Sequence, residues 1–138
     1  MKIIDRYPIV VTSHKQACRD FWQQHFDLDV LFDSDWFVLL GQADQGSVIA
    51  FMTPDHPSAP PGPECFNGQG ACIELEVADA DAALQSLTDK GVEPHYPLTR
   101  EAFGQKRFGL RDPAGVWIDV VEQVEPEAGY WDQYMQTA

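Results

Sequence analysis

The order of predicted strands and helices repeats in the two halves of this chain, and this repeat restricts the possible folds more than any other feature. Each half has one strand, one amphipathic helix and then three short strands separated by turn residues. The first half is expected to have strands at 7–12, 28–32, 36–40 and 47–52, with its helix ending near 26–27. The second half is expected to have strands at 71–77, 92–98, 105–110 and 116–122, with its helix ending at 90–91.

The spacing of the two halves supports an internal duplication, because a shift of 65 residues places Tyr7 on Cys72 and Thr12 on Val77. Between the halves lie five of the ten prolines, in a stretch that cannot form a core helix or a central strand. We therefore predict a first module at 1–53, a Pro/Gly-rich linker or lid loop at 54–70, a second module at 71–124, and a tail at 125–138 that contains a short aromatic helix.

Polar residues mark the start of each predicted helix. Ser13 and Gln16 have the spacing of a capping box. In this motif the serine side chain accepts a hydrogen bond from the backbone amide three residues later, and the glutamine side chain accepts one from the backbone amide of the serine. Asp79 is placed to cap the second helix. We expect the first helix to follow Ser13 directly.

The last predicted strand follows a turn at 111–115, in which Pro113 presets its backbone angle, Asp112 can bond back to the chain and Gly115 accepts positive φ. The strand alternates at period two, so its residues divide between two faces. The core face is predicted to hold Val116, Ile118 and Val120, and the other face Trp117, Asp119 and Val121. An aromatic ring and a carboxylate among apolar neighbours indicate either a cavity lining or a plain solvent face.

The charge balance restricts the partners of the chain. With 9 basic and 22 acidic side chains, its formal net charge is −13, which disfavours nucleic acid and anionic membranes and attracts a cationic ligand. An acidic surface also serves solubility alone. The three cysteines lack CxxC spacing, which argues against a disulfide framework or a zinc cluster. The N-terminal run is too charged for a secretory signal and no segment reaches membrane-spanning length, so we expect a cytoplasmic protein.

The duplicated βαβββ order, the polar residue before each helix and the final DPxGxxID strand together resemble the glyoxalase, bleomycin-resistance and extradiol-dioxygenase superfamily, also called vicinal oxygen chelate. The resemblance covers about residues 2–124 and is closest at 76–81 and 104–119. It implies an α+β fold, in which two tandem βαβββ modules form a curled mixed sheet around a ligand cavity. It also implies a homodimer, with modules paired within one chain or swapped between two.

Metal-using members of this superfamily place ligands on the first and last strand of each module. By this resemblance the corresponding positions here are Tyr7, Cys72, Asp119, and either Ala50 or Phe51. Asp119 alone is an ordinary ligand, although a thiolate can bind zinc and a phenolate can bind iron. The four histidines do not share one predicted face. We therefore predict a site without a metal or other cofactor.

The predicted ligand-binding residues share the cavity side of their strands or flank it. They are Tyr7, Trp36, Cys72, Glu74, Glu76, Phe103, Trp117 and Asp119. Carboxylates grouped in a partly dry cup repel one another unless Arg107, Arg111 or a cationic ligand stacked on an indole ring compensates them. Alternatively, Glu74 and Glu76 form salt bridges or meet solvent at the rim.

Two functions remain open at this point. The preferred hypothesis is a drug-binding or sequestering protein of the bleomycin-resistance type, which would confer antibiotic resistance by holding a small, cationic aromatic molecule. The alternative is a glyoxalase- or dioxygenase-like enzyme, a lyase, isomerase or oxygenase that uses a divalent metal or a carboxylate base. Glu76, Asp119 and Tyr7 are the candidate bases, whereas Cys72 has no evident base to activate it as a nucleophile.

Overall fold

The structure, a computed structural model, describes residues 1–56 and 62–135. Part of the predicted linker, residues 57–61, and the end of the tail, residues 136–138, lie outside the described residues. The described chain divides into two compact units. Within the described residues, no helix has both the length and the apolar character needed to cross a bilayer.

The first unit comprises residues 1–71 and the loop 112–116. Its four-stranded sheet has the order β1-β4-β3-β2, with β1 parallel to β4 and the other pairs antiparallel. Its elements are β1 (Ile9–Val11), α1 (Lys15–Phe26), β2 (Asp29–Asp33), β3 (Phe37–Gln42) and β4 (Gly46–Met52). The largest fully buried side chains of this unit are Trp22, Phe51, Leu40 and Ile49.

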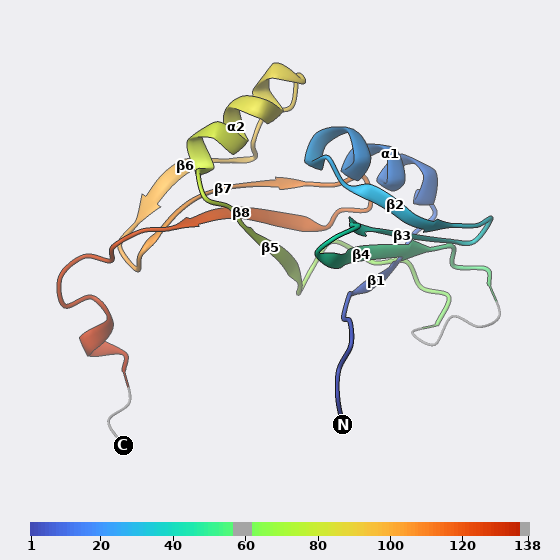
Figure 1. Cartoon of the computed structure of the whole chain (residues 1–138), viewed down its shortest axis with the longest axis horizontal. Helices are drawn as coiled ribbons and strands as arrows, with labels where there is room; N and C mark the ends of the chain where they lie inside the picture. Colours follow the sequence, from blue (N-terminus) through green and yellow to red (C-terminus); the bar gives the residue numbers. More distant parts are fainter. Residues whose placement is uncertain (57–61, 136–138) are drawn as a thin grey trace. The chain divides into compact units, whose positions relative to one another are not determined.

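The second unit, residues 72–111 and 117–138, repeats this arrangement with the order β5-β8-β7-β6 and with β5 parallel to β8 (Figure 1). Its elements are β5 (Cys72–Glu76), α2 (Ala80–Asp89), β6 (Tyr96–Glu101), β7 (Gln105–Arg111), β8 (Trp117–Gln123) and the 3-10 helix η1 (Trp131–Gln133). The predicted α+β fold of two tandem βαβββ modules is therefore confirmed, as two separate four-stranded sheets.

The two helix starts differ in how well the sequence predicted them. Asp79 caps α2 as predicted, since its Oδ1 accepts a hydrogen bond from Ala82 N at 3.0 Å. The predicted capping box at Ser13 is wrong, because the N-cap of α1 is His14, whose side chain makes no capping hydrogen bond. The hydroxyl of Thr12 instead accepts from His14 N at 3.0 Å, so a local turn before the helix moves its start by one residue.

The predicted turn before the last strand is confirmed. Asp112 Oδ1 accepts hydrogen bonds from Ala114 N and Val116 N, both at 2.9 Å, and Gly115 has a φ of +86°. Asp112 Oδ2 accepts another from Trp22 Nε1 at 2.9 Å, and both residues are buried. A carboxylate is thus held inside the first unit by three N–H donors.

One strand boundary differs clearly from its prediction. β6 begins at Tyr96 and ends at Glu101, whereas the predicted strand covered 92–98. Pro94 has no N–H to donate to a ladder, and Pro97 falls where the pairing of β6 with β7 shifts register. Proline is tolerated there because β6 is an edge strand.

Candidate functional site

The face of the second sheet opposite α2 holds five of the eight predicted ligand-binding residues. Ile118 and Val120 are buried on the α2 side of β8, and Glu122 on the same side accepts a hydrogen bond from Ala80 N at the start of α2. Strand alternation therefore places Trp117 and Asp119 on the opposite side. Pairing of β5 with β8 sets Cys72 beside Trp117, Glu74 beside Asp119 and Glu76 beside Val121. We call the side defined by Cys72, Glu74, Glu76, Trp117 and Asp119 the β5–β8 face.

Asp119 is the most buried carboxylate on this face, with 7% of its surface exposed. Its Oδ2 accepts a hydrogen bond from Arg107 Nη1 at 3.1 Å, and its Oδ1 accepts one from Trp117 Nε1 at 2.7 Å. Both carboxylate oxygens therefore have protein donors, one of them a cation. The repulsion expected among the grouped acids is reduced by Arg107, one of the three sources of positive charge that the sequence suggested.

Arg107 links Asp119 to a second carboxylate. Its Nε and Nη2 contact Glu101 Oε2 at 3.0 and 2.8 Å, and Tyr96 Oη lies 3.2 Å from each oxygen of Glu101. The guanidinium also lies over the rings of Tyr96 and Phe103, 5.4 and 5.3 Å from their centroids. Burial acts to lower the pKa of Arg107, but the hydrogen bond with Glu101 and the charges of Asp119 and Glu101 outweigh it and hold that pKa above its usual value.

Sequence reasoning missed Glu101 and Tyr96 as members of this site. Both lie on β6, whose pairing with β7 is irregular between Tyr96 and Thr99. The sequence did contain a signal for the neighbouring strand, because alternation along β7 places Arg107, Gly109 and Arg111 on one face. It contained no comparable signal for Tyr96 and Glu101 on β6.

The indole ring of Trp117 extends over β7 and fills the space beside Gly109, which has no side chain. A Cβ at position 109 would come within 2.8 Å of Trp117 Cε2 and closer still to Cζ2, so any side chain there would displace the indole ring. The hydrogen bond to Asp119 fixes the ring from its N–H edge. The guanidinium of Arg111 lies over the ring, 5.3 Å from its centroid. The ring is therefore held in one orientation beside a cation.

The other acidic and thiol groups of the β5–β8 face differ in their partners. Glu76 Oε1 accepts a hydrogen bond from Gln123 Nε2 at 2.9 Å, whereas the exposed side chain of Glu74 makes no hydrogen bond or ion pair with any described residue. Burial raises the pKa of the Cys72 thiol, and the charges of Asp119 and Glu74 raise it further. Cys72 is therefore protonated near neutral pH and is a weak nucleophile.

The residues at the family's metal positions do not fit a metal ion. Asp119 already accepts two hydrogen bonds from protein groups, and Cys72 has a raised pKa that opposes thiolate formation. Ala50 and Phe51 are fully buried and have no ligand atom in their side chains. Tyr7 and Trp36 belong to the first unit, where Trp36 stacks on His56 with a centroid distance of 3.7 Å; their part in the site stays a prediction.

A group of three carboxylates occurs on the other side of the second sheet, at the start of α2. Oxygens of Asp79, Asp81 and Glu122 lie within 4.8 Å of one another. Each already has a protein partner: Asp79 accepts from Ala82 N, Glu122 accepts from Ala80 N, and Asp81 pairs with Lys106. We assign this group to helix capping.

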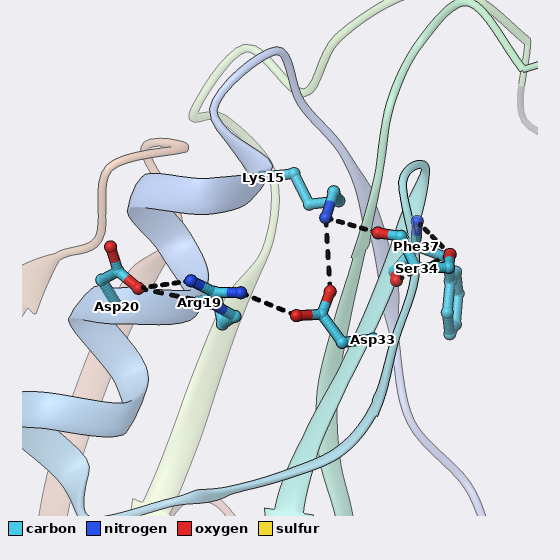
Figure 2. A network of polar contacts seen from close by, with 6 residues as sticks. All are labelled: Lys15, Arg19, Asp20, Asp33, Ser34 and Phe37. Atoms are coloured by element: carbon cyan, nitrogen blue, oxygen red, sulfur yellow. Dashed lines mark hydrogen bonds and ion pairs between the residues drawn. The ribbon is translucent and has the colours of Figure 1, made fainter.

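The first unit has a surface pocket of about 550 Å³ between α1 and the turn that joins β2 to β3. It is lined by Lys15, Gln16, Arg19, Asp33, Ser34 and Asp35. Figure 2 shows that Asp33 lies between Lys15 and Arg19, at 3.4 and 2.7 Å, and that Lys15 also donates to Ser34 O at 2.8 Å. The hydrogen bond from Arg19 lowers the pKa of Asp33. Because these charges compensate one another, we interpret the network as a clamp between α1 and the turn.

Comparison with known proteins identifies the family. The profile of the Glyoxalase/Bleomycin resistance protein/Dioxygenase superfamily matches residues 3–120. A search of curated proteins gives no significant match. Among solved structures, this chain is similar to a lactoylglutathione lyase from Agrobacterium tumefaciens, with 16% sequence identity and a TM-score of 0.69. The structural match covers 88% of this chain and 95% of the lyase chain.

Two further structures have the same fold. A protein of unknown function from Agrobacterium tumefaciens str. C58 is 26% identical, with a TM-score of 0.67 over 90% of this chain and 95% of its own. TioX from Micromonospora sp. ML1 is 16% identical, with a TM-score of 0.64 over 87% of this chain and 99% of its own. With the family profile covering most of its length, this chain belongs to the glyoxalase/bleomycin resistance protein/dioxygenase superfamily.

Proposed function

We propose that this chain is a binding protein that holds a small, planar organic molecule on the β5–β8 face and releases it chemically unchanged. The observation that carries the proposal is the fixed indole of Trp117, which has a hydrogen-bond acceptor at its N–H edge and a glycine beneath it. An aromatic side chain held in one orientation contributes contact area at little cost in conformational entropy. Ligand sites commonly combine such an apolar surface with a few polar groups that fix orientation.

Binding without turnover is favoured by the state of the groups that would perform chemistry. A general base must have a lone pair within reach of the substrate proton. The oxygens of Asp119 accept hydrogen bonds from Arg107 and Trp117, and Glu76 accepts one from Gln123. The raised pKa of Cys72 opposes its use as a nucleophile.

The proposal is tested by titrating the protein with planar aromatic compounds and analysing the recovered compounds by mass spectrometry. We expect saturable binding, an unaltered ligand, and loss of binding in Trp117→Leu. Phe32→Leu is the control, because Phe32 is an exposed aromatic residue on β2 of the first unit and should leave affinity unchanged. Binding that survives Trp117→Leu would refute the site, and conversion of the compound would establish the lyase, isomerase or oxygenase alternative.

A further inference from the structure

The turn between β6 and β7, residues 102–104, is bonded along its whole length to the segment that follows β8. Each carbonyl of the turn accepts a hydrogen bond from this segment: Gly104 O from Val124 N at 2.9 Å, Ala102 O from Glu127 N at 2.9 Å, and Phe103 O from Trp131 Nε1 at 2.8 Å. Carbonyls of a surface turn are commonly left to water. We call residues 124–131 the strap, because they hold the turn from outside the hairpin.

The strap fits the turn closely but buries little of itself. A Cβ at Gly104 would lie 3.3 Å from Cβ and Cδ of Pro126, so the strap would have to shift away from any larger residue there. The ring of Tyr130 lies 6.3 Å from that of Phe103, centroid to centroid. Trp131 nevertheless keeps 45% of its surface exposed. Segments held by a few surface contacts open locally while the sheet stays folded, and the strap is of this kind.

Phe103 connects the turn to the residues of the β5–β8 face. Its ring lies 5.3 Å from the guanidinium of Arg107. The same guanidinium donates to one oxygen of Asp119 at 3.1 Å, and the other oxygen accepts from Trp117 Nε1 at 2.7 Å. A cation–π contact requires the ring to lie over the cation. Movement of Phe103 therefore removes one of the contacts that hold Arg107 against Asp119.

We infer that the strap controls the ligand site and that Trp131 is its positioning residue. With the strap docked, the Phe103 ring stays over Arg107, and Asp119 stays oriented by that arginine. The indole of Trp117 then keeps one orientation. When the strap opens, Arg107 loses the ring contact and the indole of Trp117 gains freedom. The effect on this indole follows from the contacts alone, whereas an effect on ligand affinity rests on the proposed function.

Fluorine NMR of the full chain labelled with fluorotryptophan measures this coupling without a ligand, because each of the four tryptophans gives its own signal. Trp131→Phe keeps an aromatic ring but removes the N–H that bonds Phe103 O. We expect the signal of Trp117, assigned with Trp117→Phe, to shift or broaden in this variant. The signal of Trp22, buried in the first unit, should stay unchanged. Met135→Ala, a change at an exposed residue beyond the strap, should leave the Trp117 signal as in the wild type.

A double-variant cycle with Phe103→Leu tests the route of the coupling. In calorimetric titrations with naphthol, a neutral planar probe, Trp131→Phe should lower affinity by about 2- to 5-fold, the range for one exposed cation–π contact. Phe103→Leu should lower it at least as much. Adding Trp131→Phe to Phe103→Leu should lower it no further, because the ring through which the strap acts is then missing.

The outcomes separate this inference from the proposed function. A Trp117 signal that is unchanged in both Trp131→Phe and Trp131→Ala would overturn the control by the strap. Additive losses of affinity in the double variant would also overturn it, because a merely structural role of Trp131 gives that result. A Trp117 signal that responds to Trp131→Phe in a protein that binds no planar compound would support the strap and reject the proposed function.

Discussion

Breaking the hydrogen bond between Trp22 and Asp112 should lower the free energy of unfolding by about 2 kcal/mol, the range for a buried bond to a charged acceptor. The indole is fully buried, Asp112 is 5% exposed, and the donor–acceptor distance is 2.9 Å. The other oxygen of Asp112 accepts from Ala114 N and Val116 N. The bond therefore joins the core helix α1 to a turn whose own geometry depends on the same carboxylate.

A double-mutant cycle isolates this interaction from the packing of the ring. Trp22→Phe removes the N–H and some ring volume, for a loss of about 3 kcal/mol in total. Asp112→Asn keeps an oxygen for the two backbone amides but turns an NH₂ group toward the indole N–H, for a loss of about 2 kcal/mol. The double variant should lose less than the sum by about 2 kcal/mol, measured by urea unfolding followed by circular dichroism.

The pH dependence gives an independent check. Burial raises the pKa of Asp112 above 3.8, although hydrogen bonds from Trp22 and the turn amides act to lower it. The folded state then binds the proton more tightly than the unfolded state, so this residue's contribution to stability is largest below 3.8 and is lost as pH rises through the raised pKa. The stability of the wild type minus that of Asp112→Asn should follow this course. Additive single losses, or a difference that increases with pH, would refute the reasoning.

Three further substitutions test other parts of the structure. Gly109→Ala should displace Trp117 and lower affinity for planar probes by about 10-fold or more, as loss of a stacking contact implies; unchanged affinity in a titration would show that the ring is not the platform. Asp79→Ala should remove the acceptor of the Ala82 N–H and lower the free energy of unfolding by about 1 kcal/mol. Hydrogen exchange should show faster amide exchange at the start of α2 and no change in α1. Asp33→Asn should cost about 1 kcal/mol or less, because its partners are partly exposed, and a loss that persists undiminished in roughly 1 M salt would contradict the ionic origin of the clamp.

The parts of the fold that the sequence predicted well are those with local causes. The turn before β8 depends on the backbone preferences of Pro113 and Gly115 and on an aspartate that bonds two and four residues ahead. The cap of α2 likewise depends on one side chain and an amide three residues away. Ser13 has the same local signature, but the hydroxyl of Thr12 competes for the neighbouring amide, and the sequence does not show which of the two is used.

The sequence predicted that Trp117 and Asp119 share one face of β8, but not the contacts of their side chains, because those contacts depend on which strands are neighbours. Period-two alternation placed Asp119 and Trp117 on one face, and the structure agrees. Their contacts and orientation depend on Arg107 and Gly109 on β7, and through Arg107 on Glu101 on β6. The contact of Arg107 with Glu101 in addition requires a β6–β7 register that shifts near Pro97 and has no signature along any single strand.

This difference changes how the carboxylate at the family's metal position is interpreted. From the sequence, Asp119 is the one ordinary ligand among the residues at the family's metal positions. In the folded chain it accepts one bond from a guanidinium and one from an indole, so both of its oxygens are used to hold the side chains around it. A carboxylate at this strand position thus fixes an aromatic ring, and the neighbouring strand supplies the contacts that hold it. That strand supplies Arg107, which holds Asp119, and Gly109, which leaves space for the indole that Asp119 orients.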